Sequence, residues 1–332
     1  MNEFLKIYSS FHNNLDDILY YYIFDDITKS SAFVFAEYNS FFSNDKNTIV
    51  GKCMYINAPT MGINDKYYKK KNILGKDYMN IGYRKRGNEY IINSDKFILS
   101  LVEKNNMFRF ANSNSIFSTN YSVFDIKNVK GVSEPRKSLK MLYKKEGKFE
   151  KIIDNIMRIF KVDIDDLGLT GSLSLGSSNA SDYDIVFYGN ISKLNLIKER
   201  IDFYKNKNGH VIEYGVNWPC RFYDDDCNLI CCFFNCTDNI YEPIKNAVIV
   251  KENYSFEAKI IDDTFSILKA PILRIDEFNY DNIILFNSGF KGILKTGDII
   301  NGVGKIIRYN KNGKCKYSIL CTNPYDELIL KK

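Results

Sequence analysis

The residues from Gly171 to Val186 read GSLSLGSSNASDYDIV, and this stretch decides the fold that the sequence predicts. An apolar run ends in Gly171-Ser172, nine residues follow, and Asp182-Tyr183-Asp184 opens a second apolar run. Two aspartates at positions i and i+2 of a strand point to the same face, ~6.5–7 Å apart along the chain. This spacing suits carboxylates that hold one or two divalent ions, provided that a third acidic group completes the site.

The glycines of this stretch favour a turn that binds phosphate. Gly171 and Gly176 lack a Cβ, so the backbone there can come close to a triphosphate. Ser172 adds N–H and O–H donors. Mg²⁺ prefers oxygen ligands and shares its coordination shell with substrate phosphates, so it is the ion that this residue set favours.

The segments around the stretch have the periodicity of alternating helices and strands. Apolar residues recur at helical spacing from Phe149 to Phe160, which predicts the most secure helix of the chain. After it we expect a strand over Leu167–Gly171, a strand over Tyr183–Tyr188, a helix over Ser192–Tyr204 with Ser192 as its N-cap, and strands over His210–Val216 and Asn228–Phe234. This order predicts a small mixed sheet covered by helices on one side.

On the Gly-Ser and Asp-x-Asp residues and this order of elements, the sequence resembles the nucleotidyltransferase superfamily that includes DNA polymerase β. The motif covers about sixteen residues and the matching elements about 139–235. The whole layout also looks like that of uncharacterised prokaryotic nucleotidyltransferase-domain proteins.

The resemblance implies that Asp182 and Asp184 bind two Mg²⁺ ions and that Gly171 and Ser172 hold the phosphates. One ion lowers the pKa of an acceptor hydroxyl, which attacks the α-phosphorus of a nucleoside triphosphate, and the other stabilises the leaving pyrophosphate. The family pattern also needs a third carboxylate. We favour Glu213, which is flanked by apolar residues on the strand after the helix, and Asp226 is the alternative.

The chain is long enough for two or three domains, and we expect an α+β multidomain protein. Residues 1–135 form a β-rich or α+β domain, 136–245 the nucleotidyltransferase domain with its mixed sheet, and 246–332 a small β domain, either an antiparallel sheet or a barrel. The expected N-terminal strands include Ala32–Tyr38, Thr48–Ile56, Glu89–Ile92 and Met107–Phe110.

Charge is unevenly distributed along the chain. Met61–Tyr90 carries eight basic and three acidic residues (+5), Lys130–Glu150 seven and three (+4), and Lys151–Lys245 ten and fourteen (−4). A basic N-terminal part beside an acidic middle suits a protein whose basic part holds an anionic partner such as RNA and whose acidic part binds metal, but such charge runs are more commonly solvated surface. Tyrosines among the bases would suit stacking on unpaired bases, and they would equally suit strands.

Composition excludes several classes of protein. The longest apolar run, Ile18–Phe24, has seven residues, and a membrane-spanning helix needs about twenty. With no signal peptide, the eight cysteines are expected to be reduced in a cytoplasmic protein. Two histidines nearly rule out a His-rich zinc site, and the spacing of Cys227, Cys231, Cys232 and Cys236 suits zinc poorly.

Two hypotheses of function follow. The first is a Mg²⁺-dependent nucleotidyltransferase that moves a nucleoside monophosphate from a triphosphate to an acceptor hydroxyl, with the N-terminal region recognising the acceptor. The second is a regulatory protein that keeps the fold without the chemistry and binds nucleotide or nucleic acid through its basic segments.

Overall fold

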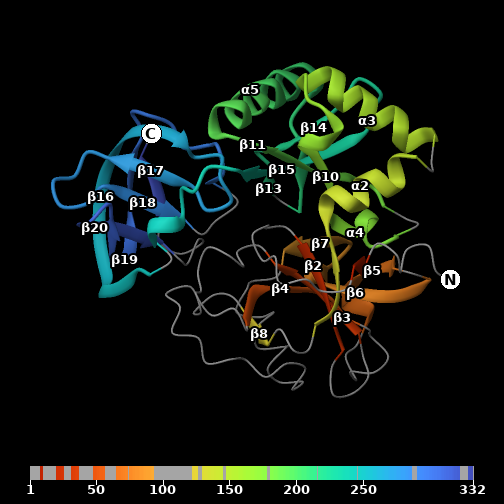
Figure 1. Cartoon of the computed structure of the whole chain (residues 1–332), viewed down its shortest axis with the longest axis horizontal. Helices are drawn as coiled ribbons and strands as arrows, with labels where there is room; N and C mark the ends of the chain where they lie inside the picture. The colour runs from red at the N-terminus through yellow and green to blue at the C-terminus, as the bar shows by residue number, and fades with distance from the viewer. Residues whose placement is uncertain are drawn as a thin grey trace.

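The protein is a mixed α/β fold that consists mostly of strands, arranged in several sheets (Figure 1). The computed structural model describes residues 8–9, 20–25, 31–36, 48–56, 65–73, 75–92, 122–125, 129–144, 147–177, 180–214, 216–244, 246–285, 290–321 and 328–331. These residues form three larger sheets, and one sheet lies within each of the predicted domain ranges 1–135, 136–245 and 246–332. Among the described residues, no helix is both long enough and apolar enough to cross a membrane.

The N-terminal sheet has nine strands in the described residues and follows the order β1-β9-β2-β3-β4-β6-β5, with β7 beside β6 and β8 beside β4. Its strands are β1 (Tyr8–Ser9), β2 (Tyr20–Asp25), β3 (Ser31–Ala36), β4 (Thr48–Ile56), β5 (Tyr68–Ile73), β6 (Lys76–Arg86), β7 (Glu89–Ile92), β8 (Ser122–Asp125) and β9 (Val129–Ser133), with the 3₁₀ helix η3 (Asp65–Tyr67) before β5. The aromatic and β-branched runs favour strands, as predicted. The predicted strand Met107–Phe110 lies outside the described residues.

The middle part places a four-stranded sheet under helices. Its elements are α2 (Pro135–Tyr143), α3 (Gly147–Phe160), η5 (Ile164–Asp166), β10 (Leu167–Leu169), α4 (Gly171–Ser174), β11 (Tyr183–Gly189), α5 (Ile191–Asn208), β14 (Arg221–Tyr223) and β15 (Leu229–Cys236). The sheet order is β10-β11-β15-β14, and only β11 and β15 run parallel. A parallel neighbour requires a crossover, which here contains α5.

Helices α3 and α5 cover one face of this sheet (Figure 1). The predicted stripe of α3 is confirmed, since Ile153 and Ile156 are buried in one core with Ile185 and Phe187 of β11. Because neighbouring residues of a strand point to opposite faces, Asp184 projects from the face away from this core.

The segment His210–Val216 does not add a strand to this sheet, contrary to the prediction. It forms part of a separate antiparallel hairpin of β12 (Ile212–Glu213) and β13 (Val216–Asn217). Tyr214, between them, has φ 56°, a left-handed conformation typical of tight turns. Glu213 therefore stands on a hairpin of its own.

The C-terminal sheet closes on itself. Its strands are β16 (Val248–Phe265), β17 (Ile272–Ile275), β18 (Asn282–Leu285), β19 (Ile299–Lys311), β20 (Lys314–Cys321) and β21 (Leu328–Lys331), after the 3₁₀ helix η6 (Glu242–Ile244). Pairing of β16 with β19 closes the order β16-β17-β18-β20-β19 into a small barrel, as predicted, although β18 and β20 pair in parallel.

Helix α5 begins at Ile191, two residues earlier than an N-cap at Ser192 would allow. Asn190 is the cap, since its side-chain oxygen accepts a hydrogen bond from the Lys193 N–H at 2.9 Å. We expect Asn190→Ala to lower the free energy of unfolding by ~0.5–2 kcal/mol in urea titrations, because an N–H of the first turn loses its partner. Ser192→Ala, the matched control inside the helix, should change it little. Equal losses would show that Asn190 is not the cap.

Candidate metal and nucleotide site

Two predicted aspartates meet a cysteine at the adjoining ends of β11 and β15. The register places Asp184 opposite Cys231, and Asp182 precedes β11. One ligand atom from each of these three residues lies within 4.8 Å of the other two. The sequence prediction that Asp182 and Asp184 converge on one face agrees with this arrangement, whereas Cys231 as their neighbour was not predicted.

Two negatively charged carboxylates are electrostatically unfavourable in this cluster. Burial and the carboxylate of Asp182 raise the pKa of Asp184 to about 7, against the opposing charges of Arg221 and Lys71. Burial also raises the pKa of the Cys231 thiol, which donates a hydrogen bond to Asp182 Oδ2 at 3.7 Å. A bound cation would relieve the repulsion between the two carboxylates.

Gly171 provides the space for the Asp184 carboxylate. A Cβ added at Gly171 would lie 1.7 Å from Asp184 Oδ2, and the residue has φ +71°. The backbones of the two residues' neighbourhoods are also bonded directly, since the Thr170 N–H donates to the Asp184 carbonyl at 2.9 Å. The Gly-Ser turn and the second aspartate therefore form one packed unit.

The rest of the predicted turn lies just beyond this contact. Ser172 is buried, and its carbonyl accepts hydrogen bonds from the N–H groups of Leu175 at 3.2 Å and Ser177 at 3.0 Å. Gly176 has φ +75°, and its N–H donates to the Leu173 carbonyl at 3.0 Å. Both predicted residues thus shape the turn that follows Gly171.

The predicted third carboxylate, Glu213, does not join the cluster. Its side chain forms an ion pair with Arg221, whose guanidinium also stacks on the Trp218 ring at 4.3 Å. The Trp218 indole N–H donates to the Glu213 carbonyl at 3.2 Å. The hairpin and Arg221 hold this carboxylate, so the expected convergence of three acids is wrong for Glu213.

The alternative ligand, Asp226, does not join the cluster either. It is exposed in the turn between β14 and β15, and its N–H donates to Asp224 Oδ1 at 3.0 Å. Asp224 is buried and accepts a second backbone hydrogen bond, at 2.8 Å, from Asn228. The Asp224 carboxylate thus stabilises the turn, and Cys231 is the residue that lies beside the aspartate pair.

The oxygen donors of Asp182 and Asp184 fit the requirements of one Mg²⁺ ion. Mg²⁺ binds proteins through one or two carboxylates and completes its shell with water and substrate phosphates. The sulfur of Cys231 is a soft ligand that suits zinc or copper(I) better than magnesium. Within the described residues, the cluster thus lacks the third carboxylate that a second Mg²⁺ would need.

The N-terminal sheet reaches the edge of this site. Lys69 Nζ of β5 donates to the Tyr214 hydroxyl at 2.9 Å, and the Tyr83 ring of β6 stacks on the Tyr214 ring at 4.3 Å between centroids. At the turn after Gly171, Ser133 Oγ at the end of β9 donates to the Ser174 carbonyl at 3.3 Å. Sequence reasoning missed these contacts, because nothing in the spacing links residues so far apart.

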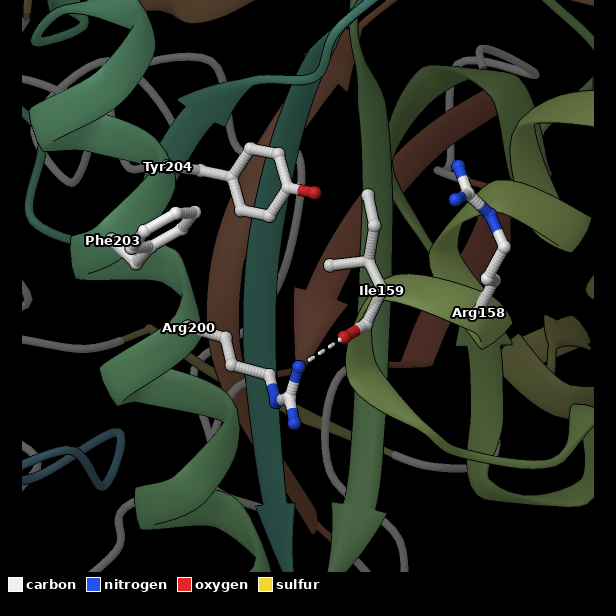
Figure 2. A pocket seen from close by; sticks show the side chains of 5 residues that line it. All are labelled: Arg158, Ile159, Arg200, Phe203 and Tyr204. Atoms are coloured by element: carbon white, nitrogen blue, oxygen red, sulfur yellow. Dashed lines mark hydrogen bonds between the residues drawn. The ribbon is translucent and has the colours of Figure 1, made fainter.

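Away from this site, a hollow lies between α3 and α5, on the helical side of the middle sheet. Figure 2 shows its lining residues, Arg158, Ile159, Arg200, Phe203 and Tyr204. Arg200 Nη1 donates to the Ile159 carbonyl at 2.9 Å, and Arg158 bonds to Asn155 at 2.6 Å. Both arginines are thus engaged locally, and none of the predicted site residues lines this hollow.

Comparison with known proteins gave no match: no protein-family model, no curated protein and no solved structure matches this chain.

Replacing Gly171 should disturb the site more than backbone strain alone explains. We expect Gly171→Ala to unfold at lower denaturant than Gly75→Ala, which has a similar φ of +77° and nothing within 4 Å of an added Cβ. The control should lose ~1–2 kcal/mol from its left-handed backbone, and Gly171→Ala more, because Asp184 must move. Equal losses of stability in the two variants would mean that the Asp184 carboxylate moves aside at no energetic cost.

Proposed function

We propose that this protein is a Mg²⁺-dependent nucleotidyltransferase that moves a nucleoside monophosphate from a triphosphate to an acceptor hydroxyl. The observation that carries the proposal is the close packing of the Asp184 carboxylate on Gly171, with Asp182 beside it. Because Gly171 has no Cβ, the backbone that would bind phosphate lies next to the carboxylates that would bind a cation.

The surrounding elements support the same proposal. The chain forms the strand β10, the turn at α4, the strand β11, the crossover helix α5 and the parallel strand β15, in the order that the sequence resemblance implies. Helices α3 and α5 fill one face of the sheet, so the opposite face of β11 is left to carry the aspartates.

In this proposal Asp182 and Asp184 hold the ion, and the turn from Gly171 to Gly176 holds the phosphates. When bound, Mg²⁺ would neutralise phosphate charge and lower the pKa of the acceptor hydroxyl. Asp184 is kept in place by its contact with Gly171 and by the β11–β15 register. Fixed positions matter here, because phosphoryl transfer depends mainly on alignment and charge stabilisation.

The acceptor that we propose is a polyanion such as RNA. Arg84, Lys85 and Arg86 are exposed at the end of β6, the same strand that contacts the hairpin through Tyr83. Tyr68 and Tyr78 are buried in the N-terminal sheet and cannot stack on bases, whereas Tyr67 is 56% exposed.

A second candidate function is nucleotide binding without transfer. The specific observation that favours it is Cys231, which stands beside the aspartate pair where a third carboxylate would complete a two-ion site. A neutral thiol there adds no charge for a second cation. The two candidates share the nucleotide site and differ in whether its single pair of carboxylates supports the reaction.

Removal of either aspartate charge tests the transferase directly. We expect Asp182→Asn and Asp184→Asn to lose transfer from α-labelled triphosphates to cellular RNA by at least about a hundredfold, because an ion ligand contributes several kcal/mol. Melting temperature should not fall for Asp184→Asn, which removes buried like charge. Asp226→Asn, with an exposed carboxylate outside the cluster, is the control and should retain activity. Unchanged labelling in both site variants would remove these aspartates from the reaction.

Restoring a third carboxylate separates the two candidates. We expect Cys231→Asp to melt at lower temperature than wild type without metal, because a carboxylate at a buried position joins the half-buried pair. Mg²⁺ should then raise its melting temperature more than that of wild type. If the wild type does not label RNA and Cys231→Asp does, the result would favour binding without transfer as the function of the wild type. Transfer by wild type itself would favour the one-ion enzyme.

A further inference from the structure

We propose that Lys71 of the N-terminal sheet binds a phosphate group of the nucleotide, so that two sheets build the triphosphate site. The inference rests on the proposed function and adds to it a residue from outside the nucleotidyltransferase motif.

The burial of Lys71 is the first observation. Lys71 is 6% exposed, whereas its neighbour Lys70 is exposed on the other side of β5. In the part of the chain that the structure describes, the Lys71 ammonium has neither an ion pair nor a hydrogen bond. Burial of most of the side chain removes much of the water that would solvate the ammonium, so an anion bound at this position would be favourable.

The charges around Lys71 are the second observation. Burial lowers its pKa, while the charges of Asp182 and Asp184 act in the opposite sense. Lys71 therefore lies within electrostatic reach of both carboxylates without pairing with either. A phosphate group matches the chemistry of these residues, since its oxygens can bind a cation held by the carboxylates and accept hydrogen bonds from an ammonium.

The anchoring of β5 is the third observation. Lys69, which is two residues away and on the same side of the strand, is hydrogen-bonded to Tyr214, and Tyr214 stacks on Tyr83 of the adjacent strand β6. These contacts fix β5 against the β12–β13 hairpin and so fix where Lys71 stands relative to the aspartates. The basic segment Met61–Tyr90 thus has one lysine assigned to the nucleotide rather than to the acceptor.

The test measures binding of inorganic tripolyphosphate with Mg²⁺ to the full-length chain by calorimetry. Trp218, the single tryptophan, stacks with Arg221 beside the site and gives a second reading through its fluorescence. We expect Lys71→Met to weaken binding by at least about tenfold, equivalent to ~1.4 kcal/mol. Lys71→Arg should recover most of the affinity, and Lys70→Met, the matched control, should change it by less than about twofold.

Thermal unfolding distinguishes a binding role from a structural one. If Lys71 serves a phosphate ligand, Lys71→Met should melt at the same or a higher temperature, because a charge on a largely buried side chain is removed. A lower melting temperature together with unchanged tripolyphosphate affinity would overturn the inference.

The remaining outcomes separate this inference from the proposed function. Wild-type affinity in Lys71→Met, combined with loss of binding in Asp184→Asn, would overturn the role of Lys71 and leave the nucleotide site standing. Tighter Mg²⁺ binding by Lys71→Met with unchanged tripolyphosphate binding would mean that the lysine only neutralises the aspartates, which also overturns it. No binding by the wild type would overturn both proposals.

Discussion

The site depends on one steric constraint, the contact between the Asp184 carboxylate and the Cα of Gly171. Any side chain at Gly171 would occupy the position of Asp184 Oδ2. This contact joins the end of β10 to the start of β11, and the hydrogen bond from Thr170 to the Asp184 carbonyl closes the same junction. The carboxylate is therefore positioned by the fold of the backbone rather than by a flexible side chain.

Charge around this junction is nearly balanced by the protein itself. Asp182, Asp184 and Glu213 face Lys69, Lys71 and Arg221, drawn from both the N-terminal and middle sheets. Arg221 is committed to Glu213, and Lys69 to Tyr214. Among the described residues, the aspartate pair and Lys71 form no ion pair with each other or with another charged side chain, and a metal-bound phosphate would satisfy these charges.

Local pattern predicted the middle elements well, because helical and strand periodicity depend on residues close in sequence. The α3 stripe, β11, β15 and the meeting of Asp182 with Asp184 follow from such spacing. The place of Glu213 does not: the same short apolar run suits either a sheet strand or a hairpin, and the left-handed Tyr214 decides it. The spacing of Cys231 and its neighbouring cysteines indicated no site, although a parallel β11–β15 alignment would have placed Cys231 beside Asp184. Lys71 carried no sequence signal, because its role comes from contacts between sheets.

The parallel register of β11 and β15 has a consequence for the order in which the chain can assemble. Asp184 and Cys231 are 47 positions apart, and they become neighbours only after α5 has crossed over the sheet. Parallel pairing across a long connection is entropically expensive and slow compared with the hairpin between β10 and β11. The aspartates are thus in place early, on a local turn, whereas the wall of the site beside them is added late. A nascent chain that ends before β15 would carry the acidic pair exposed at a sheet edge.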